Sequence, residues 1–358
     1  MKKISSFFFT ALFALLFIAC NKQLPNKEAA LVPETPDDQA IESLIVNLRS
    51  GARGTRAEAT LDGTESGNTV SSATVYVFGA DGNCLAHDAA VLNGEEWQAA
   101  FTLKKATGLT VAAVLNKSVS GITTLSSLRA KTTSLTDNSS DGFVMYGETS
   151  GVTTSNTDEV SIDVKHIAVM VEIDKITNKL KEEVFSSKPL VLKGIYLINV
   201  PVGAPAFSAI ESYSPSTWAN PCEFVSDDET DAFTADVDLD ETIALNGSHS
   251  TPHYFYGYPS NVTSDNTGDT WDDEGAFTRL VVEVEWNGDT TWYYPVTFFT
   301  AAGNVFKANN RLVISELVIE NPGSDYPNDP IEKEEATFEL NVLDWVTVLL
   351  GDNGVVTL

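Results

Sequence analysis

Residues 160–173 read VSIDVKHIAVMVEI, and this stretch decides the class of fold. Apolar and polar side chains alternate as far as Val164, which is typical of a strand with one buried face. Beyond His166 the alternation continues, but in the opposite phase. We predict one long strand with a bulge near Lys165 and His166, because one extra residue would return the apolar side chains to a single face.

Similar short runs fill the rest of the chain, separated by clusters of Gly, Asn, Asp, Ser and Pro. This pattern predicts an all-β protein with one short helix, at 124–131. The turn Asn287-Gly288-Asp289 predicts a hairpin. Two acidic stretches, 226–241 and 260–275, are expected to be irregular. The other strands are expected at 43–49, 73–78, 97–103, 109–115, 143–146, 190–200, 254–258, 279–286, 291–299, 312–319 and 337–350.

The N-terminus has the pattern of an export signal. Lys2 and Lys3 precede an apolar run that stops at Cys20, too short for a membrane-spanning helix of roughly 20 residues. Ala19 directly before Cys20 resembles the site cut by lipoprotein signal peptidase. We therefore expect residues 1–19 to be removed and Cys20 to carry lipid; the alternative is an ordinary secretory signal that contains a cysteine.

The composition excludes some partners and suggests two domains. The 358 residues carry a net charge of −28, and loss of Lys2 and Lys3 would make the mature chain more acidic still. Nucleic acid and anionic lipid surfaces are therefore poor partners. The length exceeds one typical domain, and a boundary near 186–189 fits the layout. Cys84 and Cys222 fall in different halves, and their spacing leaves a disulfide between them open.

A removable first strand is suggested by the residues after the signal. The polar stretch 21–39 predicts a tether, and Leu44, Val46 and Leu48 then alternate as a strand. Arginines follow in a loop of small residues, 49–57, which has the accessibility that a protease needs. A cut there would detach the lipid and the strand together, and would open a groove whose lost burial is worth several kcal/mol at about 1.5–3 kcal/mol per side chain.

The C-terminus offers a strand to fill such a groove. One face of an extended segment would present a row of apolar side chains interrupted by Asp344, as a donated strand requires. The same periodicity also fits the last core strand of a second domain, and the pattern alone leaves both interpretations open. The members of the row are Phe338, Leu340, Val342, Val346, Val348 and Leu350.

In its motifs the chain resembles the major fimbrial subunits of Bacteroidales, the type V pilins of the Porphyromonas kind. The resemblance covers nearly the whole length, and the order and spacing of the matching stretches carry it. They are the leader ending in Ile18-Ala19-Cys20, ATVYVF at 73–78, VSIDVKHIAVMVEI at 160–173, TWYYPV at 291–296, NNRLVI at 309–314, NDPI at 328–331 and LNVLDW at 340–345.

The resemblance implies two transthyretin-like β-sandwiches and assembly by strand exchange. An arginine-specific protease would cut between Arg56 and Ala57, or less favourably between Arg53 and Gly54, and a neighbour's C-terminal strand would replace the first strand. The implied segments are the signal peptide 1–19, the propeptide 20–56, the sandwiches 57–186 and 187–335, and the donor 336–358. Further implications are a lipoprotein precursor at the outer membrane, a mature fimbrium at the cell surface, adhesion and biofilm formation, accessory pilins, and host protein or glycan receptors.

The sequence shows no catalytic or cofactor-binding pattern, so we predict a protein that is not an enzyme and needs no cofactor. His249 and His253 have a spacing that would align metal ligands on a helix, but Pro252 argues against a helix, and no metal is assigned. Asp236, Asp238 and Asp240 fit a solvated acidic loop better than a calcium site. His166 stands where the family usually has arginine, and no role is assigned to it.

Two other functions remain as alternatives. An anchor or tip subunit of the same family would lack the cleavage loop or the donor strand, respectively, and this chain has candidates for both. A surface glycan-binding lipoprotein would use exposed aromatic side chains, for which 254–258 and 271–275 are the candidates.

Overall fold

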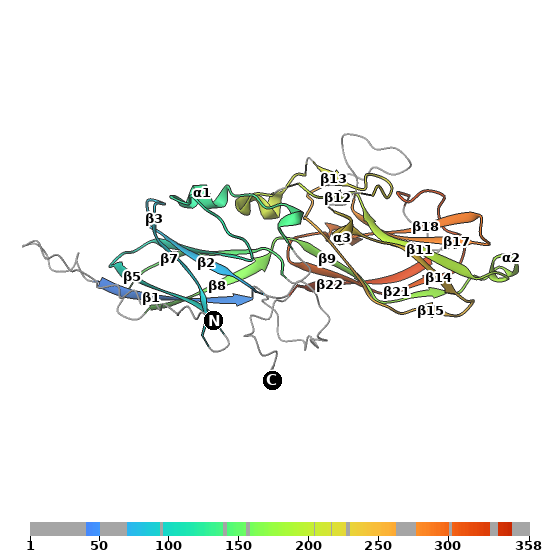
Figure 1. The fold of residues 1–358 in the computed structure, drawn as a ribbon, viewed down its shortest axis with the longest axis horizontal. Helices are drawn as coiled ribbons and strands as arrows, with labels where there is room; N and C mark the ends of the chain where they lie inside the picture. Colours follow the sequence, from blue (N-terminus) through green and yellow to red (C-terminus); the bar gives the residue numbers. More distant parts are fainter. Residues whose placement is uncertain are drawn as a thin grey trace, which may run out of the picture. The chain divides into compact units, whose positions relative to one another are not determined.

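A computed structural model describes residues 41–50, 70–93, 96–138, 142–154, 158–203, 205–215, 217–226, 230–262, 277–300, 303–329 and 336–345. Over these ranges strands dominate, which confirms the predicted all-β class (Figure 1). The helices are α1 (Leu125–Arg129), α2 (Glu183–Ser186), α3 (Asp231–Thr234) and the 3-10 turns Leu135–Asp137 and Phe207–Ser212. None of the helices in the described ranges is long and apolar enough to cross a membrane.

The first sandwich is formed by two sheets that join at a corner. One sheet has the order β3 (Cys84–Ala89), β2 (Ala73–Phe78), β6 (Leu109–Leu115), β7 (Met145–Val152). The other has the order β8 (Asp158–His166), β1 (Ile41–Ser50), β5 (Glu96–Lys104), β4 (Val91–Asn93). The corner lies where Met145 and Tyr146 of β7 pair with β8. Gly147 permits this approach, because a Cβ there would lie 2.3 Å from the carbonyl oxygen of Asp163.

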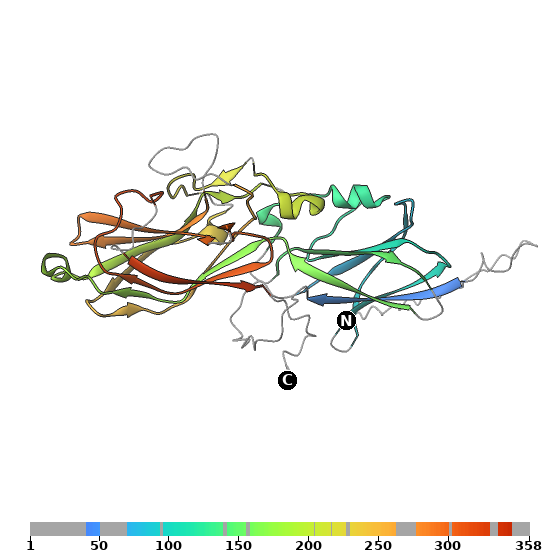
Figure 2. The same ribbon diagram turned by 180° about the vertical axis from the view of Figure 1, so that it is seen from behind.

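The second sandwich also has two sheets (Figure 2). One has the order β14 (Ala235–Ile243), β11 (Leu190–Ile198), β17 (Arg279–Trp286), β18 (Thr290–Thr297). The other is built on β21 (Asn310–Ile319), which pairs with β22 (Ala336–Asp344) and with β9 (Val169–Ile173) followed by β10 (Ile176–Asn178). Outside these lie β16 (His253–Gly257) and β15 (Ser248–His249). Two short ribbons, β12 (Val200–Pro201) with β13 (Trp218–Ala219) and β19 (Phe299–Thr300) with β20 (Gly303–Asn304), complete the strands.

The predicted hairpin between β17 and β18 is confirmed. Trp286 pairs with Thr290 across the turn. Asn287 and Gly288 have φ values of 59° and 84°, the left-handed conformation that these two residue types adopt most readily.

The stretch 160–173 is not one bulged strand. β8 ends before β9 begins, and the two belong to different sandwiches. Ile162 and Val164 are buried in the first core, whereas Val169 and Val171 are buried in the second. The change of phase therefore marks the passage of the chain from one core to the other, because each half of the pattern serves a different buried face.

Two further features differ from the expected layout. β9 and β10 precede the boundary expected near 186–189, yet they pair with β16, β15 and β21, which follow it. The acidic stretch 226–241 was expected to be irregular, but its described part contains α3 and most of β14, whose pairing with β11 is interrupted by one register shift. Most of the second acidic stretch, 263–275, lies outside the described residues.

Candidate assembly site

β1 lies between β5 and β8 and pairs with both along nearly its whole length. It runs antiparallel to β5, from Ile41 opposite Lys104 to Leu48 opposite Trp97. It runs parallel to β8, from Leu44 opposite Asp158 to Ser50 opposite Val164. Removing β1 would leave a slot of one strand's width, with unpaired backbone groups on both walls.

The apolar side chains of β1 fill the first core. Leu44 and Val46 are 0% exposed and Leu48 is 2% exposed, and all three belong to the cluster that contains Phe101 and Ile162. Complete burial of such side chains stabilises a fold by about 1.5–3 kcal/mol each. The predicted first strand therefore has the apolar face that the sequence indicated.

β1 also buries polar groups that fit poorly. Glu42 is 7% exposed and Asn47 is 4% exposed. Among the residues that the structure describes, neither Glu42 Oε2 nor Asn47 Oδ1 has a hydrogen-bond partner. A buried polar group without a partner costs about 1–3 kcal/mol, so β1 stabilises the sandwich by less than its apolar burial alone would suggest.

The modification and cleavage positions follow or precede this strand. β1 ends at Ser50, so Arg49, the first arginine of the predicted loop 49–57, lies in the strand. The lipidation and cleavage residues themselves lie outside the described residues; they are Cys20, Arg53, Gly54, Arg56 and Ala57.

The first half of the C-terminal row belongs to the second sandwich. β22 pairs antiparallel with β21. Leu340 packs against the second core, whereas Phe338 and Val342 are 38% and 42% exposed. The second half of the row lies outside the described residues and consists of Val346, Val348 and Leu350.

Trp345 holds the end of β22 in place. It is 1% exposed, and its ring stacks on that of His166 with a centroid distance of 3.9 Å and an interplanar angle of 5°. The Trp345 N–H donates to the carbonyl of Asn309 at 2.7 Å, and the His166 N–H donates to Asn309 Oδ1 at 3.0 Å. His166 therefore has a structural place between the two sandwiches, which the sequence did not reveal.

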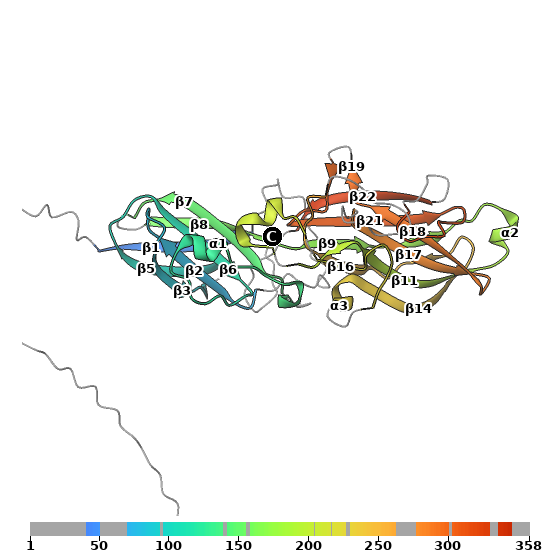
Figure 3. The same cartoon turned by 90° about the horizontal axis from the view of Figure 1, so that it is seen from above.

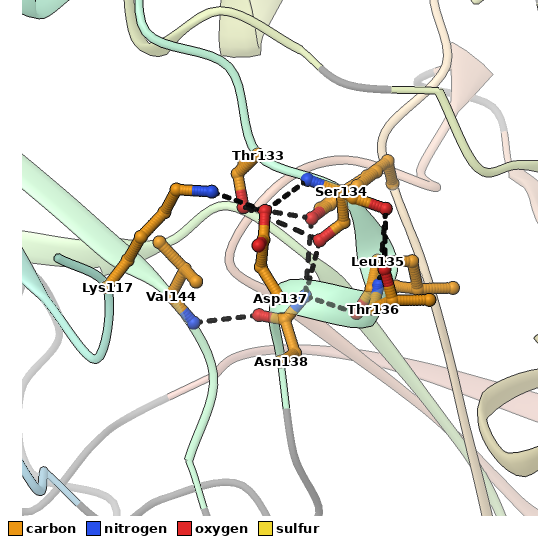
Figure 4. Close-up of polar contacts among 9 residues, drawn as sticks. Lys117, Thr133, Ser134, Leu135, Thr136, Asp137, Asn138 and Val144 are labelled. Carbon is orange, nitrogen blue, oxygen red and sulfur yellow. Dashed lines mark hydrogen bonds and ion pairs between the residues drawn. The ribbon is translucent and has the colours of Figure 1, made fainter. Parts of the chain in front are cut away.

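A second polar network ties the loop after α1 to the end of β16. Tyr258 is fully buried; its hydroxyl lies 3.3 Å from Thr133 Oγ1 and accepts from Asn138 Nδ2 at 3.2 Å. Asn138 Oδ1 accepts from the Val144 N–H at 2.8 Å, and Asp137 forms an ion pair with Lys117 (Figure 4). Burial raises the pKa of the Tyr258 phenol, so the hydroxyl stays protonated. The hydrogen bonds of Tyr258 to Thr133 and Asn138 therefore join the two sandwiches between neutral groups.

A buried arginine occupies a third polar site. Arg279 is 0% exposed and donates to Asn328 Oδ1 at 2.6 Å, and Asn199 donates to the same oxygen at 2.8 Å. Asn328 begins the stretch NDPI, one of the motifs on which the resemblance rests. That motif was the only sequence signal for this site, because the partners of Asn328 come from distant strands.

The structure also bears on the expected sugar-binding surface and on the possible disulfide. Phe255, Tyr256 and Tyr258 of the aromatic stretch are buried, so they do not form an exposed sugar-binding surface. The second candidate, 271–275, lies outside the described residues. Cys84 and Cys222 are both free thiols and form no disulfide with each other.

Comparison with known proteins agrees with the resemblance. Residues 32–183 match the family model of the major fimbrial subunit protein (FimA). No curated protein sequence matches the chain. Among solved structures, a putative cell adhesion protein from Bacteroides eggerthii has a TM-score of 0.63 at 16% identity, covering 88% of this chain and 98% of its own.

Two solved fimbrial proteins of Porphyromonas gingivalis have the same fold. A fimbrilin has a TM-score of 0.58 at 15% identity, covering 86% of this chain and 98% of its own. The tip fimbrial protein Mfa3, with a C-terminal truncation, has a TM-score of 0.53 at 14% identity, covering 86% of this chain and 100% of its own. The similarity to fimbrial subunits that the sequence predicted is confirmed.

Proposed function

Because residues 32–183 match the major fimbrial subunit family, we propose that the chain is a structural shaft subunit of a surface fimbria and not an enzyme. The precursor is lipidated at Cys20 and reaches the outer membrane. An arginine-specific protease then cuts between Arg56 and Ala57 and releases the lipid together with β1. A strand from a neighbouring copy fills the slot, and the repetition of this step builds a fibre that supports adhesion and biofilm formation.

The position of β1 is the observation that supports this proposal most strongly. A strand near the N-terminus of the precursor lies inside a sheet, between β5 and β8, and not at its edge. Its three apolar side chains are almost completely buried, so its loss leaves a defined groove. The poorly satisfied Glu42 and Asn47 favour replacement, because an incoming strand without buried polar atoms would fit the slot better.

We further propose that the donated segment begins after Trp345. β22 pairs with β21 of its own chain, and Trp345 is buried against His166. Withdrawing β22 would cost these contacts, so we assign the donated segment to residues 346–358, which follow Trp345 in the sequence. In that segment Val346, Val348 and Leu350 have the same two-residue spacing as the three buried side chains of β1.

The experiment that tests the proposal is cleavage followed by assembly. The purified precursor is treated with an arginine-specific protease, and the new N-terminus is determined by sequencing and intact mass. We expect a start at Ala57 and the appearance of multimers that resist denaturant. The double variant Arg53→Gln, Arg56→Gln should remain monomeric, and Arg53→Gln alone serves as the matched control. Monomers that persist after complete cleavage would contradict strand exchange.

The alternatives predict a different product on cells. A glycan-binding lipoprotein or an anchor subunit would keep Cys20 and β1 in the mature form. A tip subunit would be cleaved but would not donate a strand, and would therefore cap fibres without extending them. N-terminal sequencing of the protein sheared from cells therefore distinguishes a shaft or tip subunit, which would begin at Ala57, from an anchor subunit or a glycan-binding lipoprotein, which would begin at Cys20.

A further inference from the structure

Four titratable side chains form a line across one side of the second sandwich. His249 Nδ1 lies 2.7 Å from Glu241 Oε2, and His253 Nδ1 lies 2.6 Å from Asp236 Oδ2. The two Nε2 atoms face each other at 2.7 Å. The histidines are buried, at 6% and 7% exposure.

The strand pairing explains why these side chains meet. β14 and the β15–β16 strand are edge strands of the two facing sheets, and Figure 3 shows β14 and β16 on the same side of the sandwich, next to α3. His249 is paired with Ile176 and His253 with Ile173. Both isoleucines point into the core, and directly paired residues share a face, so both histidines point inward.

A register shift in β14 places both carboxylates on the side of the histidines, with each side chain about half-exposed. Asp236 is opposite Ile195 and Glu241 is opposite Leu192, and both of these partners are core residues. A regular strand would place them on opposite faces, but the register shifts at this point. The shift uses left-handed residues at Asp238 and Asp240, with φ values of 59° and 49°. Aspartate tolerates this conformation better than most residues, which gives the acidic run a structural reason.

The hydrogen bonds fix the tautomers of the two rings. Ionised carboxylates only accept, so each Nδ1 carries a hydrogen and donates it to Asp236 or Glu241. Each Nε2 then directs its lone pair at the other. Two lone pairs at 2.7 Å repel each other unless a positive charge lies between them. A shared proton meets that requirement, and so does a metal ion bound by both nitrogens.

We propose that His249 and His253 bind a divalent transition metal ion through their Nε2 atoms, with Asp236 and Glu241 orienting the rings. A carboxylate behind each ligating imidazole is the arrangement found around zinc-binding histidines. The Zn–N distance of about 2.0–2.1 Å and tetrahedral angles require the nitrogens to lie about 3.4 Å apart, so the rings must separate by less than about 1 Å. Edge strands can accommodate that movement.

The chemistry of the ligands selects the class of ion. Imidazole nitrogen suits Zn²⁺, Cu²⁺ and Ni²⁺, whereas Mg²⁺ and Ca²⁺ prefer oxygen ligands. No group of three or more metal-binding side chains occurs within the described part of the chain, so water would complete the coordination. A hollow lined by Asp236, His253 and Tyr254 lies beside the site and provides a path from solvent.

The test is a zinc titration of the full chain, purified without a histidine tag and freed of metal with chelator. Isothermal calorimetry in excess Mg²⁺ should give one saturable Zn²⁺ site per chain. His249→Gln and His253→Gln should each weaken binding at least tenfold. His87→Gln is the matched control and should bind as the parent does, because His87 is exposed and belongs to the first sandwich.

Two more measurements keep the test decisive. Asp236→Asn and Glu241→Gln leave both histidine ligands in place and should weaken Zn²⁺ binding by about 10–100-fold. Both carboxylates are about half-exposed, so these variants should fold even if a histidine variant does not. Electron paramagnetic resonance of bound Cu²⁺ should show coupling to two imidazole nitrogens. Two results would overturn the proposal. Absence of a saturable Zn²⁺ site would mean that a proton alone links the two rings. Equal binding by the parent and both histidine variants would mean that the ion binds elsewhere.

Discussion

A chain that begins at Ala57 should lose most of the stability of its first sandwich while keeping that of its second. The deletion removes Leu44, Val46 and Leu48, which are at most 2% exposed. At about 1.5–3 kcal/mol each, the lost burial is about 4.5–9 kcal/mol. Because the unfolded chain is partly compact, this is an upper estimate. Typical domains are stable by only about 5–15 kcal/mol, so the first sandwich should become marginal.

Urea denaturation measures the effect directly. The intact chain and the shortened chain are compared by circular dichroism and tryptophan fluorescence at low concentration. We expect the shortened chain to show an additional early transition for the first sandwich, because the second core contains no β1 residue. Adding a peptide of residues 41–50 to the shortened chain should move the transition of the first sandwich back to the urea concentration seen for the intact chain. The same peptide with Val46→Asp should not do so.

The origin of the donor can be tested in the same assay. A peptide of residues 346–358 should also stabilise the shortened chain, and one of residues 336–344 should do so less, since β22 already has a place in its own sheet. A shortened chain that stays monomeric and unfolds like the intact one would refute the argument that β1 fills a required slot.

Three further substitutions test other parts of the structure. Trp345→Ala should destabilise the chain by about 3–5 kcal/mol in urea denaturation, because a buried ring that stacks on His166 is lost; a change under about 1 kcal/mol would show that β22 is not held there. Gly147→Ala should cost about 1–3 kcal/mol, since its Cβ would lie 2.3 Å from a backbone oxygen of β8, and an unchanged melting temperature would contradict the close approach. Burial raises the pKa of Glu172 to about 7, so the folded state holds a proton that the unfolded state releases above about pH 4.5. The free energy of unfolding should therefore fall as the pH rises from about 4.5 to 7. Glu172→Gln should remove this dependence of stability on pH.

Local patterns predicted the strands that lie in the cores. The expected ranges 73–78, 109–115 and 279–286 coincide with β2, β6 and β17, because each is a compact apolar run bounded by turn residues. The apolar face of β1 was likewise visible in the alternation of its residues. These features depend on neighbours in the sequence, which a single chain displays.

Features that depend on which strands pair were not predictable in this way. The chain passes from one sandwich to the other at 167–168. In the sequence this passage cannot be told from a bulge, because each reverses the alternation of apolar and polar residues. Aspartate is depleted in strands, so the residues 226–241 predict a loop where β14 forms. The sequence spacing of His249 and His253 suggests only a helical metal site, because their partners Asp236 and Glu241 become neighbours through the facing edges of two sheets.

The place of β1 inside a sheet also bears on how a fibre resists pulling. The slot of β1 has a strand ladder on each flank. In the proposed fibre, a donated strand in this slot would be loaded lengthwise under tension. The hydrogen bonds of both ladders would then share the force. Rupture under force depends on the rate of escape over a barrier and not on the equilibrium free energy. A subunit joint of modest affinity can therefore withstand strong flow, provided that the force is brief compared with the lifetime of the joint.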